Sequence, residues 1–293
     1  LNNKKQIIKF YTEKEEFEDM EIKKFNSKTR AFVKIEDGCE NFCSYCIIPY
    51  VRGPVRSKEP KKITTEIEEL VKSGHKEIVL TGIHTGHYGT DLKFFNFADI
   101  VQLILRIKNL YILRISSIEI TELIDTILQV YSENDILAQH FHIPLQSGCD
   151  KTLKDMNRKY DTKYFKEKIE QIRKIKPDTS ITTDVIVGFP GETEEDFNKT
   201  IEFIKEMKFS KVHVFPYSER KGTKSEQLPN KINPTIIKQR AQQLLKLSKE
   251  LENDYYNKFL NKKVRVLIEE QKNDYYVGHT SNYLKIHTKN LMY

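Results

Sequence analysis

The 293-residue sequence contains no apolar run near the roughly 20 residues that a membrane-spanning helix needs. Near the amino terminus, Lys4 and Lys5 are not followed by an apolar stretch, so we expect no secretory signal peptide in these residues. Internal repeats and low-complexity tracts are also missing. There are only 4 cysteines, and 3 of them stand in one short motif, which argues against a disulfide-stabilised secreted protein. We therefore expect a cytoplasmic protein with no membrane partner.

The composition is that of a folded chain with a mild basic bias. Apolar residues make up 38% and aromatic residues 11%, enough for one large domain and a smaller one. The formal charge of +7 permits a nucleic-acid partner, although an AT-rich genome would explain the many lysines equally well. The chain begins with Leu1, and its first residues are highly charged and weakly patterned. We interpret residues 1–24 as a linker remnant of a longer protein.

The most informative motif holds three cysteines within eight residues, Cys39, Cys43 and Cys46. Three thiolates can bind three irons of a 4Fe-4S cluster and leave the fourth iron without a protein ligand. A zinc site is the alternative, and it would need a fourth ligand such as Cys149 or one of the 8 histidines. A disulfide would leave one of the clustered thiols unpaired. The motif therefore predicts a metal site, and an iron-sulfur cluster with an open iron in particular.

Short strand-like segments alternate with helical patterns through most of the chain. The segments are rich in branched and aromatic residues and lie at 31–35, 77–81, 112–116, 140–144, 182–187 and 211–215. Apolar residues at helical spacing follow several of them, namely Ile63, Ile67, Leu70 and Val71; Leu123, Ile127 and Val130; Phe197, Ile201, Ile204 and Met207. Thr193 and Asp196 have the spacing of a helix cap. This order predicts an α/β fold with parallel strands in an incomplete (β/α)6 barrel.

Distinctive residues follow the end of each predicted strand. They stand in the cysteine loop and at 81–86, 117–119, 144–148, 188–192 and 216–218. The carboxyl ends of parallel strands share one edge, which is the catalytic face in barrels of this kind. We therefore expect one active site built from six loops.

The pattern changes after a long predicted helix at 234–259. Strand-like segments at 264–268, 275–280 and 283–287 predict a small antiparallel β module, which would be incomplete at Tyr293. The predicted domains are thus 25–256 for the barrel and 257–293 for the module.

The cysteine spacing, with Tyr45 just before the last thiol, resembles that of the radical S-adenosylmethionine (SAM) enzymes. The runs at 79–83, 114–119, 142–148, 183–193 and 212–218, together with Leu153, Met156, Arg158 and Tyr160, resemble the methylthiotransferases within that superfamily. Among these, the sequence is most similar to the tRNA threonylcarbamoyladenosine methylthiotransferases. The resemblance covers about residues 25–293 and implies addition of a 2-methylthio group to the modified adenosine next to the anticodon.

The resemblance also implies roles for individual residues. Cys39, Cys43 and Cys46 would ligate the 4Fe-4S cluster, and the backbone at Tyr45 would meet the adenine of S-adenosylmethionine. Further candidates for cofactor binding are Thr81, Gly82, Ser117, Gln146, Arg158, Asp184 and Gly188. Arg158 suits the cofactor's carboxylate, whereas Ser117, Gln146 and Asp184 could instead satisfy polar backbone groups of the barrel. Four histidines are placed near the site without an assigned role: His84, His87, His140 and His142.

The terminal module resembles the TRAM domain, a small RNA-binding barrel. Its basic residues outnumber the acidic ones, with Lys258, Lys262, Lys263, Arg265, Lys272, Lys285 and Lys289 against Glu269, Glu270 and Asp274. Tyr275, Tyr276 and Tyr283 are interleaved and could stack on bases or pack a small core. Arg220, Lys221 and Lys224 would extend the basic path. The implied partners are a tRNA anticodon stem-loop and an electron donor such as flavodoxin or ferredoxin.

The sequence departs from the family in one important respect. Family members begin with a further domain whose three cysteines hold a second 4Fe-4S cluster, and this chain has no such ligands. Cys149 stands where relatives commonly have serine, and Ile120 where they usually have proline; we interpret Cys149 as a small loop residue. We therefore predict that this chain alone cannot complete methylthiolation. The alternatives are a methylthiotransferase acting on a ribosomal protein aspartate, and an inactive RNA-binding module that carries a cluster.

Overall fold

Six parallel strands lie in sequence order and form two three-stranded sheets. The computed structural model describes residues 17–19 and 29–289, so most of the predicted linker at 1–24 lies outside the described residues. The first sheet has the order β1-β4-β5, with β1 at Arg30–Lys34, β4 at Glu77–Thr81 and β5 at Ile112–Ile115. The second has the order β6-β7-β8, with β6 at His140–His142, β7 at Ser180–Val187 and β8 at Lys211–Pro216.

The predicted six strands are all present, but they do not form one continuous ladder. Between β5 and β6 the pairing is reduced to a single parallel bridge, Leu113 with Leu137, and to the Ile118 N–H that donates to the His142 carbonyl at 3.0 Å. The segment that pairs with β5 thus ends before β6 begins, and β6 pairs with β7 instead. The α/β class and the parallel strands are confirmed; the strands form two sheets that meet at this seam, and the incomplete (β/α)6 barrel stays a prediction.

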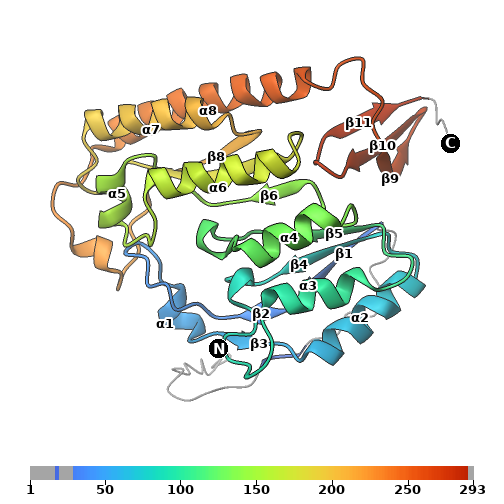
Figure 1. Ribbon diagram of the computed structural model, residues 1–293. Coiled ribbons are helices and arrows are strands. Elements are labelled where there is room, and N and C mark those ends of the chain that lie inside the picture. Colours follow the sequence, from blue (N-terminus) through green and yellow to red (C-terminus); the bar gives the residue numbers. More distant parts are fainter. Residues whose placement is uncertain (1–16, 20–28, 290–293) are drawn as a thin grey trace, which may run out of the picture.

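Helices connect the strands and cover them (Figure 1). The helices of the two parallel sheets are α1 Ile48–Arg52, α2 Pro60–Lys72, α3 Phe97–Leu105, α4 Asp125–Glu133, α5 Asp150–Asp155, α6 Thr162–Ile175, α7 Glu194–Met207 and α8 Pro234–Asn257. Short 3-10 turns lie at η1 Thr85–His87, η2 Ile120–Glu122 and η3 Lys224–Gln227, and a small hairpin joins β2 Glu36–Asp37 to β3 Arg56–Ser57. In Figure 1, α2, α3, α4 and α6 lie in front of the strands. Among the described helices, none combines the length and the apolar character needed to cross a bilayer.

The predicted apolar faces form the core. Ile63, Ile67 and Leu70 of α2 are fully buried, as are Phe197 and Ile204 of α7. Burying each large apolar side chain contributes about 1.5–3 kcal/mol, which is what holds these helices on the sheets. The prediction that Leu123 shares a helix with Ile127 and Val130 is wrong. Leu123 is buried, but it precedes α4, which begins at Asp125.

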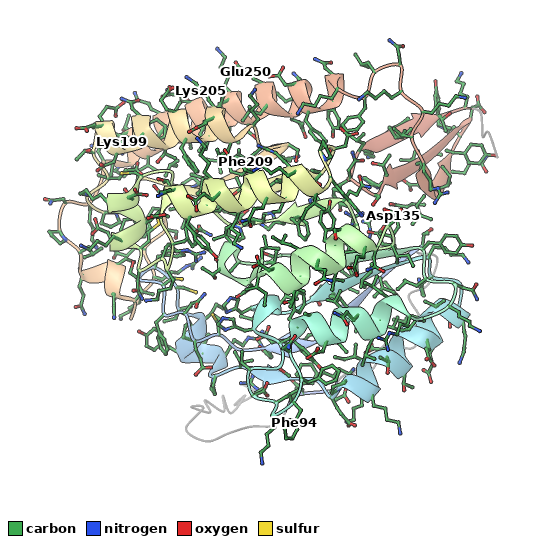
Figure 2. The ribbon with its side chains drawn as sticks, viewed as in Figure 1. Phe94, Asp135, Lys199, Lys205, Phe209 and Glu250 are labelled. Carbon is green, nitrogen blue, oxygen red and sulfur yellow. The ribbon has the colours of Figure 1, made fainter. Side chains whose placement is uncertain are left out.

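Aromatic packing fills the space beneath α6 and α7. Phe165 of α6 lies edge-on to Phe209, with ring centroids 6.1 Å apart, and Phe209 is fully buried (Figure 2). The predicted cap of α7 is confirmed, since Thr193 accepts the Asp196 N–H and Asp196 accepts the Thr193 N–H. The cap fixes the amino-terminal end of α7 near the loop that follows β7, and Phe209 packs just beyond its carboxyl end.

The carboxyl-terminal residues form a three-stranded antiparallel sheet, β9 Val266–Lys272, β10 Tyr275–Thr280 and β11 Lys285–Thr288. The predicted strands begin two residues too early in β9 and β11. In β11 the reason is Tyr283, whose φ of 68° belongs to a turn. The predicted domain boundary at 256/257 falls at the end of α8 and stays a prediction.

Candidate functional site

The three clustered cysteines lie on one loop between β2 and α1. All three are free and half-buried. The loop is closed by the Cys39 N–H, which donates to the Gly53 carbonyl at 3.1 Å, and by the Cys46 N–H, which donates to the Cys43 carbonyl at 3.0 Å. Gly38 precedes it with a φ of 95°, and a Cβ there would stand 2.0 Å from the Pro54 carbonyl oxygen. Only glycine therefore allows this turn to form without displacing the backbone.

The thiols are close enough to affect one another's ionisation. Burial, together with the charges of Cys43 and Cys46, raises the pKa of the Cys39 thiol to about 12. Burial also raises the pKa of the Cys46 thiol. Three adjacent thiolates are favourable only around a positive centre. This donor set therefore fits an iron-sulfur cluster with three protein ligands, as the sequence predicted.

Arg158 extends to the same loop. Its Nη1 lies 3.3 Å from the Cys43 sulfur, its Nε donates to the Tyr160 hydroxyl at 3.0 Å, and its Nη2 pairs with the Glu119 carboxylate. Burial raises the pKa of Glu119, although the Arg158 charge opposes that rise. The guanidinium proposed for the cofactor's carboxylate is thus already engaged by a protein carboxylate and a thiol. Its role toward the cofactor stays a prediction, and the observed contacts stabilise the cysteine loop.

One cavity of about 320 Å³ brings together three of the predicted cofactor residues, Tyr45, Gln146 and Asp184. Asp184 Oδ2 lies 3.2 Å from Nε2 of His142. Gln146 has a φ of 66°, and its backbone joins the edge of β7 through the Asp184 carbonyl at 2.8 Å. The backbone of Gln146 therefore has a structural role, while its side chain lines the cavity together with the other two.

The other predicted cofactor residues have different surroundings. Thr81 ends β4, and Ser117 is half-buried in the loop after β5. A Cβ on Gly82 would stand 2.5 Å from Glu36 Oε2, and one on Gly188 would stand 2.4 Å from Ile237 Cγ1. Gly188 thus allows α8 to pack closely over the loop after β7. These positions share the expected sheet edge, and their contacts with a cofactor stay predictions.

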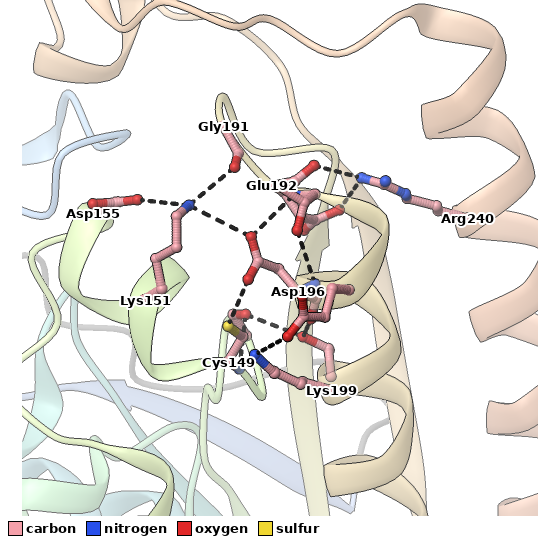
Figure 3. Close-up of polar contacts among 12 residues, drawn as sticks. Cys149, Lys151, Asp155, Gly191, Glu192, Asp196, Lys199 and Arg240 are labelled. Carbon is pink, nitrogen blue, oxygen red and sulfur yellow. Dashed lines mark hydrogen bonds and ion pairs between the residues drawn. The ribbon is translucent and has the colours of Figure 1, made fainter.

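Cys149 is a loop residue as expected, at the N-cap position of α5. It is buried, and its S–H donates to Asp196 Oδ1 at 3.3 Å (Figure 3). The same carboxylate lies 3.5 Å from Lys151 Nζ, which also donates to the Gly191 carbonyl. Cys149 therefore ties α5 to α7 and is not available as a fourth zinc ligand. Among the histidines, His84 lies beside the motif, with Nδ1 3.6 Å from the Cys39 sulfur.

Two glutamates near the site were not predicted. Glu36, fully buried, accepts the His84 N–H at 2.8 Å, and burial raises its pKa to about 7. Glu122 contacts the imidazoles of His84 and His87. The only sequence signal for Glu122 was its position three residues after Glu119, which is the spacing of a capping box.

At the amino-terminal end of β6, Tyr283, in the turn between β10 and β11, contacts the parallel strands. Its ring stacks on His140 with centroids 4.9 Å apart and on His279 with centroids 5.0 Å apart, and the Arg114 guanidinium lies 4.5 Å from the ring centre. Tyr283 therefore contacts protein groups on both faces although its exposed fraction, 39%, is close to the 42% of Tyr275. A cavity of about 490 Å³ is lined both by residues of the parallel strands, such as His142 and Thr182, and by His279 and Lys285 of the terminal sheet.

The cysteine loop and the parallel strands behind it define the class of protein. The radical SAM superfamily model matches residues 33–204, and the chain belongs to that superfamily. Membership implies a 4Fe-4S cluster and S-adenosylmethionine.

Similarity to individual proteins is more informative than the superfamily match. The chain is 42% identical over 276 residues to the threonylcarbamoyladenosine tRNA methylthiotransferase MtaB of Bacillus subtilis, which covers 92% of this chain and 61% of that protein. It is 40% identical over 243 residues to a tRNA-2-methylthio-N(6)-dimethylallyladenosine synthase of Desulfitobacterium hafniense. That match covers 83% of this chain and 54% of the relative. The chain thus spans little more than half the length of these relatives. Coproporphyrinogen III oxidase HemN of Escherichia coli, a radical SAM enzyme, matches in fold with a TM-score of 0.58 at 15% identity, covering 78% of this chain and 54% of that one.

Proposed function

We propose that this chain is the radical SAM part of a tRNA methylthiotransferase that adds a 2-methylthio group to threonylcarbamoyladenosine next to the anticodon. The observation that carries the proposal is the loop with Cys39, Cys43 and Cys46 beside the cavity of Tyr45, Gln146 and Asp184. The similarity to the Bacillus subtilis MtaB over 92% of the chain supports the substrate.

The three cysteines would hold the cluster, and the adjacent cavity would hold S-adenosylmethionine. Bound together, these cofactors supply a 5′-deoxyadenosyl radical that can abstract an unactivated hydrogen such as that on adenine C2. The chain's own residues position and shield the site. Arg158 donates to the Cys43 thiolate, and Asp184, held by His142, is placed to accept hydrogen bonds from ribose hydroxyls.

RNA would approach the same edge of the sheet. Arg220 lines the cavity with Tyr45, so a basic group stands where the cofactor pocket opens. In the terminal sheet, which we propose to be a TRAM-like module, Tyr275 is exposed and Lys289 lies 4.9 Å from its ring centre. A basic group paired with an accessible aromatic face suits a single-stranded loop. The proposed partners are a tRNA anticodon stem-loop and a flavodoxin or ferredoxin as electron donor.

The chain as given would bind and cleave S-adenosylmethionine without completing methylthiolation. Of its four cysteines, three share one loop and the fourth is bonded to Asp196, so no set remains for a second cluster. Sulfur insertion therefore needs ligands that these residues do not supply.

The first test is anaerobic reconstitution with iron and sulfide, followed by electron paramagnetic resonance of the reduced protein with and without S-adenosylmethionine. The expected result is a 4Fe-4S signal that shifts when the cofactor is added, together with release of 5′-deoxyadenosine. A protein that binds no iron, or whose signal ignores the cofactor, would contradict the proposal in favour of an RNA-binding module without activity.

The substrate is tested separately, by gel-shift binding to anticodon stem-loops that carry either threonylcarbamoyladenosine or dimethylallyladenosine. The proposal expects tighter binding of the first. Equal binding would leave the radical chemistry in place and remove the substrate assignment.

A further inference from the structure

Two histidines and one glutamate meet behind the cysteine loop, outside the cofactor cavity. His84 precedes the 3-10 turn η1 and His87 ends it. Residues three apart in a 3-10 turn lie on the same side. Their rings face each other, with centroids 3.7 Å apart and planes inclined by 32°. The turn therefore presents two imidazoles in one direction.

Glu122, the last residue of η2, brings a carboxylate to these imidazoles. Its Oε1 contacts Nε2 of His84 and lies 3.4 Å from Nε2 of His87. Its Oε2 accepts the N–H of Glu119 at 3.2 Å, which fixes the orientation of the carboxylate. One ligand atom from each of the three residues lies within 4.8 Å of the others. Loops following two neighbouring strands, β4 and β5, thus converge on one point.

Gly86 leaves the space that the carboxylate occupies. A Cβ at this position would stand 1.9 Å from Glu122 Oε2 and 2.8 Å from its Cβ. Since side chains do not approach so closely, any other residue here would push Glu122 away from the imidazoles. The glycine between the two histidines is therefore part of the arrangement.

The Glu122 carboxylate is not paired with a permanently charged side chain in the part of the molecule that the structure describes. The side chains of His84 and Glu122 are 6% and 8% exposed. Within the described residues, the imidazoles of His84 and His87 are the only basic side chains within ion-pair distance of the Glu122 carboxylate, and they carry a charge only when protonated. The buried Nε2 of His84 and Oε1 of Glu122 lack a hydrogen bond of acceptable geometry. The buried His84 imidazole and Glu122 carboxylate therefore present unsatisfied ligand atoms to a cation.

We propose that His84, His87 and Glu122 bind a divalent first-row transition ion, Zn²⁺ or Fe²⁺, through the two Nε2 atoms and the carboxylate. Two imidazoles and one carboxylate are a common donor set for both ions, and three protein ligands leave a position open for water or a substrate atom. His87 is 31% exposed and gives solvent access to that position. Nδ1 of His84 faces the Cys39 sulfur at 3.6 Å, so one imidazole separates the proposed ion from the cysteine loop. This inference does not depend on the proposed reaction or its substrate.

The test uses the cluster-loaded protein, in which the cysteines are occupied. Equilibrium dialysis against micromolar Zn²⁺, followed by elemental analysis, should find about one zinc per chain beyond the cluster iron. X-ray absorption at the zinc edge should show nitrogen and oxygen ligands with imidazole scattering. Sulfur in the shell would mean that zinc has entered the cysteine motif with His84, and would overturn the proposal.

Variants locate the site. His87→Ala removes one ligand and Gly86→Ala displaces the carboxylate without removing any donor; both should weaken zinc binding at least about tenfold. The exposed His287 of β11 provides the matched control, and His287→Ala should bind zinc as the parent does. Cluster absorbance near 400 nm verifies that each variant is folded. Parent-like zinc binding by His87→Ala, or no retained zinc in the parent protein, would show that these residues form a hydrogen-bonded His-Glu group that holds no metal.

Discussion

The Arg158 guanidinium donates to the Cys43 sulfur at 3.3 Å while it pairs with the Glu119 carboxylate, so one buried cation serves a thiol and an acid at once. Removing it leaves Glu119 buried without its partner, which typically costs about 3–5 kcal/mol. We expect Arg158→Gln to lower the free energy of unfolding by about that amount in urea titrations. The double variant with Glu119→Gln should recover part of the loss. A double variant no more stable than the single one would show that the pair does not act as a unit.

The cavity next to the cysteines is tested through Asp184. Asp184→Asn keeps the shape and removes the charge that faces His142, and we expect S-adenosylmethionine to bind at least about tenfold more weakly, or about 1.4 kcal/mol. Calorimetry on the cluster-loaded protein measures this. Asp135, whose side chain is 95% exposed, provides a control, since Asp135→Asn should leave binding unchanged. Equal affinities for both variants would remove Asp184 from the site.

The turn before Cys39 predicts a contrast between two glycines. Gly38 and Gly74 both have positive φ, at 95° and 102°, but a Cβ on Gly38 would meet the Pro54 carbonyl whereas one on Gly74 meets nothing within 4 Å. Gly38→Ala should lose most of its ability to assemble the cluster. Gly74→Ala should lower the free energy of unfolding by about 1–2 kcal/mol, the cost of a positive φ for a residue with a Cβ, and should still assemble the cluster. Iron and sulfide content per chain measures the difference, and similar losses in both would contradict it.

Glu36 predicts a pH dependence of stability. Burial raises its pKa in the folded protein from 4.5 to about 7, so the folded state binds more protons than the unfolded state between these values. Stability should therefore fall as pH rises from about 4.5 to 7. Glu36→Gln, which stays neutral, should make this part of the profile less steep in chemical denaturation of the metal-free protein, and Glu122, whose pKa is also raised to about 7, accounts for part of the remaining slope. An unchanged slope would assign the effect to another group.

Two tyrosines of the terminal sheet should behave differently. Tyr283 packs between His140 and His279, so Tyr283→Ala should speed amide hydrogen exchange in the antiparallel sheet. Tyr275 is exposed, and Tyr275→Ala should weaken binding of an anticodon stem-loop by about 1–3 kcal/mol without changing exchange. The opposite pattern would reverse the roles assigned to the two rings.

The sequence was most informative where local patterns decide structure. The strand at 77–81 was predicted to the residue because branched residues stand between a polar turn and Gly82, and the cap of α7 followed from Thr193 and Asp196 alone. The pairing of segments that are distant along the chain was harder to predict from the sequence. The seam between β5 and β6 depends on which residues of the 134–142 segment meet β5, and no local signal fixes that register.

The same distinction holds for the site. The cysteine loop could be predicted because its three thiols are close together along the chain, and their role as cluster ligands stays a prediction. The partners of Arg158, and the meeting of Glu122 with two imidazoles, depend on loops from different strands, so composition and spacing could not reveal them. The family resemblance suggested a cofactor carboxylate as the partner of Arg158, and that role stays a prediction; the pairing of Arg158 with Glu119 was not predicted.

Ser44 connects the cysteine loop to the second half of the molecule through hydrogen bonds. It belongs to the first half of the parallel strands, yet its hydroxyl donates to the Asp155 carbonyl at 2.8 Å and its carbonyl accepts the Ser225 N–H at 2.8 Å, both from the second half. Because β5 and β6 share little ladder pairing, these hydrogen bonds help to hold the two parallel sheets together. A local separation of the two sheets would also expose the cysteine thiols further, so oxidation of the metal centre and proteolysis of the chain should begin from the same open conformation.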